Sequence, residues 1–66
     1  MYYWKTFYNR EIAEMVFEYL KGIFEHKVTL EHRNWQYEIT ITNPDLEHLT
    51  DVQREMAKFF MPHMFN

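Results

Sequence analysis

The stretch Trp35-Gln36-Tyr37-Glu38-Ile39-Thr40-Ile41-Thr42 alternates large apolar residues with polar ones. Alternate side chains of a β-strand lie on opposite faces, so a period of two is typical of a strand with one buried face. We therefore predict a strand over residues 35–42, with the odd positions buried and the even positions facing solvent. We expect it to be the central strand of a small sheet, with helices on its apolar side.

Two flanking segments also have strand character. Residues 1–8 are rich in aromatic and β-branched side chains, and residues 27–32 place Val28 and Leu30 on one face. The faces of the first strand are harder to separate, because Trp4 lies on one and Lys5 on the other. Since a lysine favours solvent, we predict that Trp4 points inward and that Phe7 turns into the core as the strand ends.

The first helix is predicted to begin at Asn9, whose side chain is a good N-cap. Apolar residues then recur at helical spacing. They are Ile12, Ala13, Val16, Phe17, Leu20 and Phe24. Gly22, the only glycine in the sequence, is predicted to end this helix in a left-handed conformation.

The last helix has two possible starts. One uses Asn43 as the cap with Pro44 in the first turn, and the other uses the capping box Thr50-Asp51-Val52-Gln53. We favour a short turn over residues 44–49 and the main helix over residues 50–61, ended by Pro62. The predicted apolar stripe is Leu49, Val52, Met56, Phe59 and Phe60. Residues 63–66 are expected to be loose, with apolar side chains able to dock back.

The predicted order is β-α-β-β-α in a single α+β domain over residues 1–66. The arrangement expected from this order is a three-stranded sheet with two helices on one face, a ferredoxin-like fold that lacks the last strand. Strand 35–42 then lies between the other two, and one edge of the first strand is open. Open edges invite pairing with another chain, so we expect a homodimer, either joined along this edge or domain-swapped.

Composition limits the function classes. The chain has 66 residues and no cysteine, so disulfides are excluded. Its net charge of −3 opposes nonspecific binding to nucleic acid or anionic membranes. No apolar run is long enough to span a membrane, and Lys5 interrupts the aromatic N-terminus where a signal peptide would be apolar. We predict a cytoplasmic protein without direct membrane insertion.

Catalytic motifs are missing from the sequence. Serine and cysteine do not occur, a single glycine cannot build a phosphate-binding loop, and the four histidines lack metal-ligand spacing. Glu31 and Glu38 are expected to be neighbours on the outer sheet face, as part of a cross-strand charge pattern. The same face, predicted to carry Tyr3 and Lys5 among threonines and acids, is a poor base-stacking platform. We therefore predict no enzyme activity, no metal, no cofactor and no nucleic-acid partner.

Parts of the chain resemble the cytoplasmic N-terminal domain of bacterial rhomboid proteases. The resemblance rests on Phe7-x-Asn9, Ile12-Ala13 and Tyr19-Leu20, and on the segment from Val52 to Phe60. It implies a β-α-β-β-α accessory module that has no catalytic residues of its own and can form swapped dimers.

We predict a non-enzymatic protein–protein interaction or regulatory module that self-associates. The predicted interaction residues are Tyr2, Tyr3 and Lys5 on the first strand, with Phe60, Met61, Met64 and Phe65 at the C-terminal end. One alternative is a free-standing small acidic phage-type protein that inhibits a partner enzyme. A third, a small-ligand binder or enzyme, has the least support because no convergent polar groups are visible.

Overall fold

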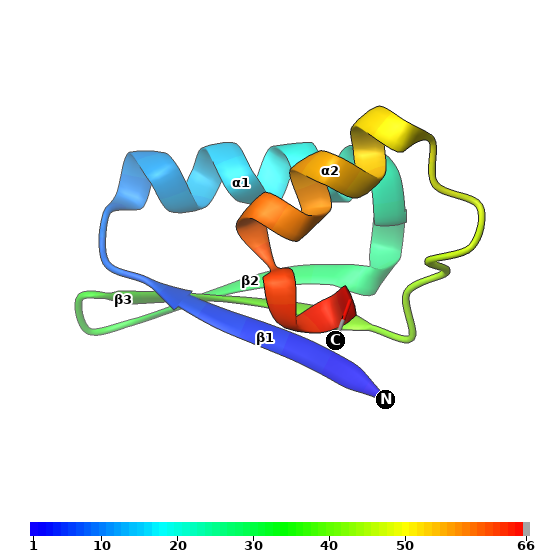
Figure 1. Cartoon of the computed structure of the whole chain (residues 1–66). Coiled ribbons are helices and arrows are strands. Elements are labelled where there is room, and N and C mark those ends of the chain that lie inside the picture. The colour runs from blue at the N-terminus through cyan, green and yellow to red at the C-terminus, as the bar shows by residue number, and fades with distance from the viewer. Residues whose placement is uncertain (66) are drawn as a thin grey trace.

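A computed structural model describes residues 1–65 of the chain (Figure 1). The elements follow in the order β1 (Tyr2–Phe7), α1 (Arg10–Phe24), the 3-10 helix η1 (Glu25–Lys27), β2 (Val28–Arg33), β3 (Gln36–Thr42), α2 (Asp51–Phe60) and the 3-10 helix η2 (Pro62–Phe65). Both α-helices lie on the same side of the sheet (Figure 1). The predicted β-α-β-β-α fold is confirmed.

Strand β3 is the centre of the sheet, which has the order β1-β3-β2. It pairs antiparallel with both neighbours, and Ile39 lies between Lys5 of β1 and Leu30 of β2. Ile39 and Ile41 are fully buried against the helices, as their alternation with polar residues predicted. The sequence pattern therefore identified both the central strand and its buried face.

The prediction that Trp4 points inward is wrong. The β1–β3 register pairs Tyr3 with Ile41 and Lys5 with Ile39, so the odd positions of β1 face the helices. Trp4 instead lies opposite Thr40 on the outer face, and 52% of its surface is exposed. The register of the whole strand decides the face, and it places Lys5 at the edge of the helix side, where its long side chain can still reach solvent.

Trp35 is also not part of the buried face. Arg33 pairs with Gln36, so Asn34 and Trp35 form the two-residue turn between β2 and β3. Asn34 adopts a positive φ of 57°, which asparagine tolerates in a tight turn. The turn takes Trp35 out of the strand and leaves 72% of its surface exposed.

Helix α1 begins as predicted, with the Asn9 side chain accepting a hydrogen bond from the Ile12 backbone N–H at 3.0 Å. It does not end at Gly22. The helix continues to Phe24, which is buried in the core, and Glu25 takes the left-handed φ of 57° after it. Burial of the Phe24 side chain explains why the helix runs past the glycine.

Helix α2 begins with the predicted capping box. The Gln53 backbone N–H donates to Thr50 Oγ1 at 3.1 Å, and the Thr50 N–H donates to Gln53 Oε1 at 3.0 Å. Residues 44–49 form an irregular segment without helix, so the alternative start at Asn43 is wrong. The capping box satisfies two backbone N–H groups in the first turn of the helix, whereas a start at Pro44 has no such box. This difference favours the later start.

The predicted apolar stripe of α2 is only partly buried. Val52 and Phe59 are 70% and 75% exposed, whereas Ala57 and the C-cap residue Met61 are fully buried. Helix α2 is therefore rotated about its axis from the predicted orientation. The chain after Pro62 explains this rotation, because η2 folds back and places Met64 in the core beside Met61. The buried core contains Val16, Leu20, Phe24, Val28, Ile39, Ile41, Ala57, Met61 and Met64.

The C-terminal segment was expected to be loose with apolar side chains able to dock back, and its described part is docked on the core. Residues 62–65 form η2, and Met64 is only 3% exposed. The remaining residue of that prediction, at position 66, lies outside the described residues.

Candidate functional site

The outer edge of β1 is the first candidate site. Strands β1 and β2 are the two outer strands, so within residues 1–65 each has one edge without a neighbouring strand. The Asn43 N–H donates to the Met1 carbonyl at 2.8 Å, and bonded pairs alternate along an antiparallel ladder. The odd residues of β1 therefore bond to β3, and the N–H and C=O groups of Tyr2, Trp4 and Thr6 point away from the sheet.

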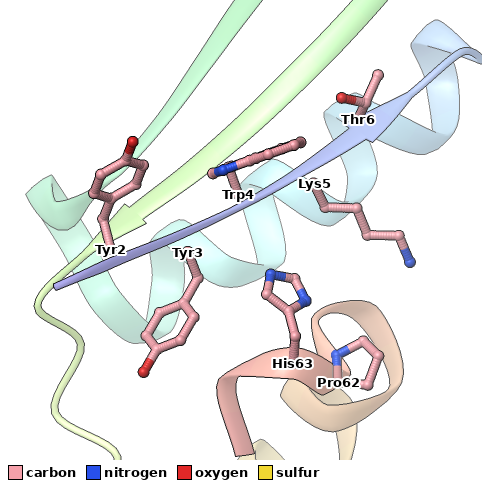
Figure 2. Close-up of a pocket in the computed structure, with 7 residues that line it drawn as sticks. All are labelled: Tyr2, Tyr3, Trp4, Lys5, Thr6, Pro62 and His63. Carbon is pink, nitrogen blue, oxygen red and sulfur yellow. The ribbon is translucent and has the colours of Figure 1, made fainter.

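A groove of about 490 Å³ lies along this edge. It is lined by Tyr2, Tyr3, Trp4, Lys5, Thr6, Pro62 and His63. Figure 2 shows β1 along one side of the groove and the start of η2 facing it. The Tyr3 and His63 rings meet edge to face with centroids 5.9 Å apart, so the two ends of the chain hold the groove together.

Lys5 supplies a positive charge at this edge. Its ammonium lies 5.4 Å from the centroid of the Phe7 ring, a cation–π contact on the helix side of β1. A charged side chain on an edge strand discourages indiscriminate pairing with other chains. The edge thus combines outward-pointing backbone groups with a positive charge.

The predicted interaction residues do not form a single surface. Tyr2, Tyr3 and Lys5 come together in the groove. Met61 and Met64 are buried in the core, which leaves their side chains inaccessible to a partner. The remaining two are partly buried against the core, with Phe60 against Tyr19 at 5.9 Å between ring centroids and Phe65 beneath the Arg54 guanidinium at 5.8 Å.

The groove is also lined by four residues that the sequence did not indicate as interaction residues. They are Trp4, Thr6, Pro62 and His63. Trp4 was assigned to the wrong face, and Thr6 follows the same face as Trp4. Pro62 and His63 depend on the docking of η2. The spacing of Met61 and Met64, one helical turn apart after a helix end, was the available signal that this segment packs on the core.

The outer face of the sheet carries a charge cluster. Glu31 and Glu38 are directly paired across β2 and β3, as predicted, and Arg33 Nη2 lies 2.9 Å from Glu31 Oε2. The hydrogen bond from Arg33 to Glu31, with the charges of both glutamates, raises the pKa of Arg33. Lys5, which was expected beside these carboxylates, lies on the other face. The arginine offsets the repulsion between the two acids, which is a structural role.

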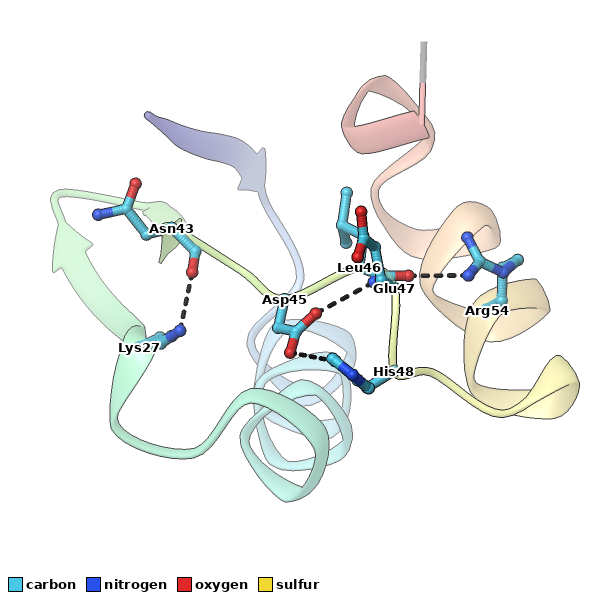
Figure 3. Close-up of polar contacts among 7 residues, drawn as sticks. All are labelled: Lys27, Asn43, Asp45, Leu46, Glu47, His48 and Arg54. Carbon is cyan, nitrogen blue, oxygen red and sulfur yellow. Dashed lines mark hydrogen bonds and ion pairs between the residues drawn. The ribbon is translucent and has the colours of Figure 1, made fainter.

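A second hollow of about 450 Å³ lies between η1 and the segment 44–49, next to the start of α2. Figure 3 shows the contacts that position this segment. The Lys27 ammonium donates to the Asn43 carbonyl at 2.9 Å, and Arg54 Nη2 donates to the Leu46 carbonyl at 2.8 Å. These bonds satisfy the backbone of an irregular connection between β3 and α2.

Asp45 organises the same segment. Its carboxylate accepts from the Glu47 N–H at 3.1 Å, and its Oδ2 lies 2.6 Å from His48 Nδ1 (Figure 3). The hydrogen bond with His48, followed by that from Glu47, lowers the pKa of Asp45. Both side chains are more than half exposed, so the pair stabilises the turn without enclosing a reactive group.

Within residues 1–65, no cluster of three or more histidine, aspartate or glutamate side chains is arranged to hold a metal ion. No helix over those residues has the length and apolar character needed to cross a membrane.

The helices also expose apolar side chains. Val52, Met56 and Phe59 follow one face of α2, and Ile12 and Met15 are about half exposed on α1. The Phe59 ring contacts Phe60 at 5.4 Å between centroids, and Phe60 in turn contacts α1. Both α-helices therefore carry exposed apolar side chains outside the core.

Comparisons with protein-family models, with curated proteins and with solved structures find no match to this chain. The resemblance to the rhomboid N-terminal domain stays a prediction.

Proposed function

We propose that this chain is a non-enzymatic protein–protein interaction module that self-associates through the outer edge of β1. The observation that carries the proposal is the groove along that edge, where outward-pointing backbone groups of Tyr2, Trp4 and Thr6 lie beside the wall formed by Pro62 and His63. An extended strand added to a sheet edge gains main-chain hydrogen bonds, and flanking side chains give it specificity.

The side chains at the edge support a second copy of the chain as the partner. Tyr2 and Trp4 are 62% and 52% exposed on the outer face, next to the unpaired edge. Aromatic side chains are enriched in protein interfaces because they bury a large area at low entropic cost. A second β1 would bring the same aromatic side chains and the same edge groups.

The experiment that tests the proposal is a proline substitution that removes one outward-pointing N–H. In Thr6→Pro the lost donor is not needed for pairing with β3, so we expect a folded protein whose self-association is lost or much weaker. Sedimentation velocity over a range of concentrations measures the mass, and circular dichroism checks the fold.

Thr6→Ala is the matched control, because it shortens the same side chain but keeps the N–H. It should associate like the natural chain. A natural chain that stays monomeric at the highest concentration tested, or a folded Thr6→Pro variant that associates normally, would contradict the proposal.

A further inference from the structure

We infer that two copies of the chain pair their β1 strands antiparallel about a two-fold axis at Trp4. This inference rests on the proposed self-association and specifies its register. The two three-stranded sheets then join into one continuous sheet, with β1 of each copy in the middle. The occupant of the groove is therefore β1 of a second copy.

The hydrogen-bonding pattern selects this register. Only the even residues of β1 direct their N–H and C=O groups outward, so a bonded pair must join an even residue to an even residue. With the axis at Trp4, the bonded pairs are Trp4 with Trp4 and, on either side, Tyr2 with Thr6. Moving the axis to Tyr3 or to Lys5 leaves only two bonded pairs within the strand, because the third falls beyond its end.

The side chains on the helix side agree with the same axis. Lys5 of each copy then lies opposite Tyr3 of the other, in a non-bonded pair where Cα atoms approach to about 4.5 Å. A lysine over a tyrosine ring is a favourable cation–π contact. An axis at Lys5 would instead place Lys5 opposite Lys5, and directly opposed like charges are destabilising.

The outer face gains a matching contact. Trp4 lies opposite Trp4 across the axis, and its ring is already exposed on that face (Figure 2). Aromatic cross-strand pairs are among the favourable ones in sheets. Thr6 and Tyr2 flank this central pair, so both aromatic side chains of the outer face are covered by the partner.

The charges along the two open edges favour pairing through β1 over pairing through β2. On β2, the same alternation of bonded pairs leaves the backbone groups of Val28, Leu30 and His32 pointing outward. Pairing two β2 strands about Leu30 would bring Arg33 opposite Lys27, two cations at the ends of the strand. The β1 edge has no such conflict in its best register.

Single-cysteine variants test the register, because the natural chain has no cysteine. A disulfide requires Cα atoms within about 6.8 Å, which the proposed axis provides for position 4 at about 5.5 Å. Positions 3 and 5 are then diagonal to their own copies, at about 7–8 Å. We therefore expect Trp4→Cys to form a disulfide dimer fastest under mild oxidation, ahead of Tyr3→Cys and Lys5→Cys.

Glu18→Cys, on the exposed side of α1, measures the background of random collisions. Circular dichroism of each variant excludes unfolded samples, which matters most for the partly buried Tyr3. In the natural chain, isotope-filtered NMR on a mixed labelled sample should show contacts between Lys5 of one copy and the Tyr3 ring of the other.

The outcomes separate the register from the proposed function. Fastest cross-linking at position 3 or 5 in a protein that self-associates would overturn the register and leave the interface in place. Background rates at all three positions, with a monomeric mass for the natural chain, would overturn both. Background rates with a dimeric mass would move the interface away from β1.

Discussion

At the scale of single residues, Asp45 shows how an exposed side chain can order a connection. Its carboxylate accepts hydrogen bonds from His48 and from the Glu47 backbone within four residues of chain. These bonds favour the ionised form and lower the pKa of Asp45 below its ordinary value of 3.8. Its stabilising contribution is therefore complete above the ordinary pKa and is lost as the pH falls through the lowered one.

The effect of His48 on Asp45 can be measured directly. We expect the His48→Ala variant to raise the titration midpoint of the Asp45 carboxyl carbon, followed by NMR from pH 6 to pH 2. His63→Ala, in the β1 groove, is the control and should leave that midpoint unchanged. An Asp45 midpoint that does not move in His48→Ala would mean that this hydrogen bond does not form in solution.

At the scale of the elements, local chemistry predicted the starts of both α-helices better than their ends. The Asn9 cap and the Thr50–Gln53 capping box depend on neighbouring residues alone, and both were identified from sequence. The end of α1 depends on Phe24 reaching the core, which is a tertiary effect. Gly22 was therefore assigned a capping role that Glu25 performs.

Gly22 provides a test of this reading. It lies inside α1 without a positive φ, and an added Cβ would meet nothing within 4 Å. We expect Gly22→Ala to raise the free energy of unfolding by about 0.5–1 kcal/mol, measured by urea denaturation. A destabilised variant would indicate that Gly22 has the left-handed conformation predicted from sequence. Ala13→Gly in the same helix should change stability in the opposite direction.

At the scale of the whole molecule, the chain has more large apolar side chains than its core can hold. Periodicity marks which residues of α2 share a face, but the rotation of the helix is set by η2, which supplies Met64 to the core. The faces of β1 were equally ambiguous, because both carry aromatic residues, and only the pairing of Tyr3 with Ile41 resolves them. Sequence thus predicted the β1 edge, whereas the Pro62–His63 wall required the folded chain.

Substitutions at Met61 and Phe59 compare a core position with a surface position. We expect Met61→Ala to cost about 2–5 kcal/mol of stability, because it empties a fully buried site. Phe59→Ser, at a side chain that is 75% exposed, should stay within about 0.5 kcal/mol of the natural chain. Urea denaturation at one low protein concentration compares the two, and equal losses would contradict the observed rotation of α2.

The contact between Tyr3 and His63 has a consequence for the folding pathway. It joins residues near opposite ends of the sequence, and contacts of such long separation carry a high loop-closure entropy. The β2–β3 hairpin and α1 depend on shorter-range contacts, so they can form before β1 and η2 meet. A chain in which β1 and η2 have not yet met has strand edges without the Pro62–His63 wall. Selective pairing is then a property of the completed fold, and aggregation during refolding should compete with it most strongly when the two chain ends are slow to dock.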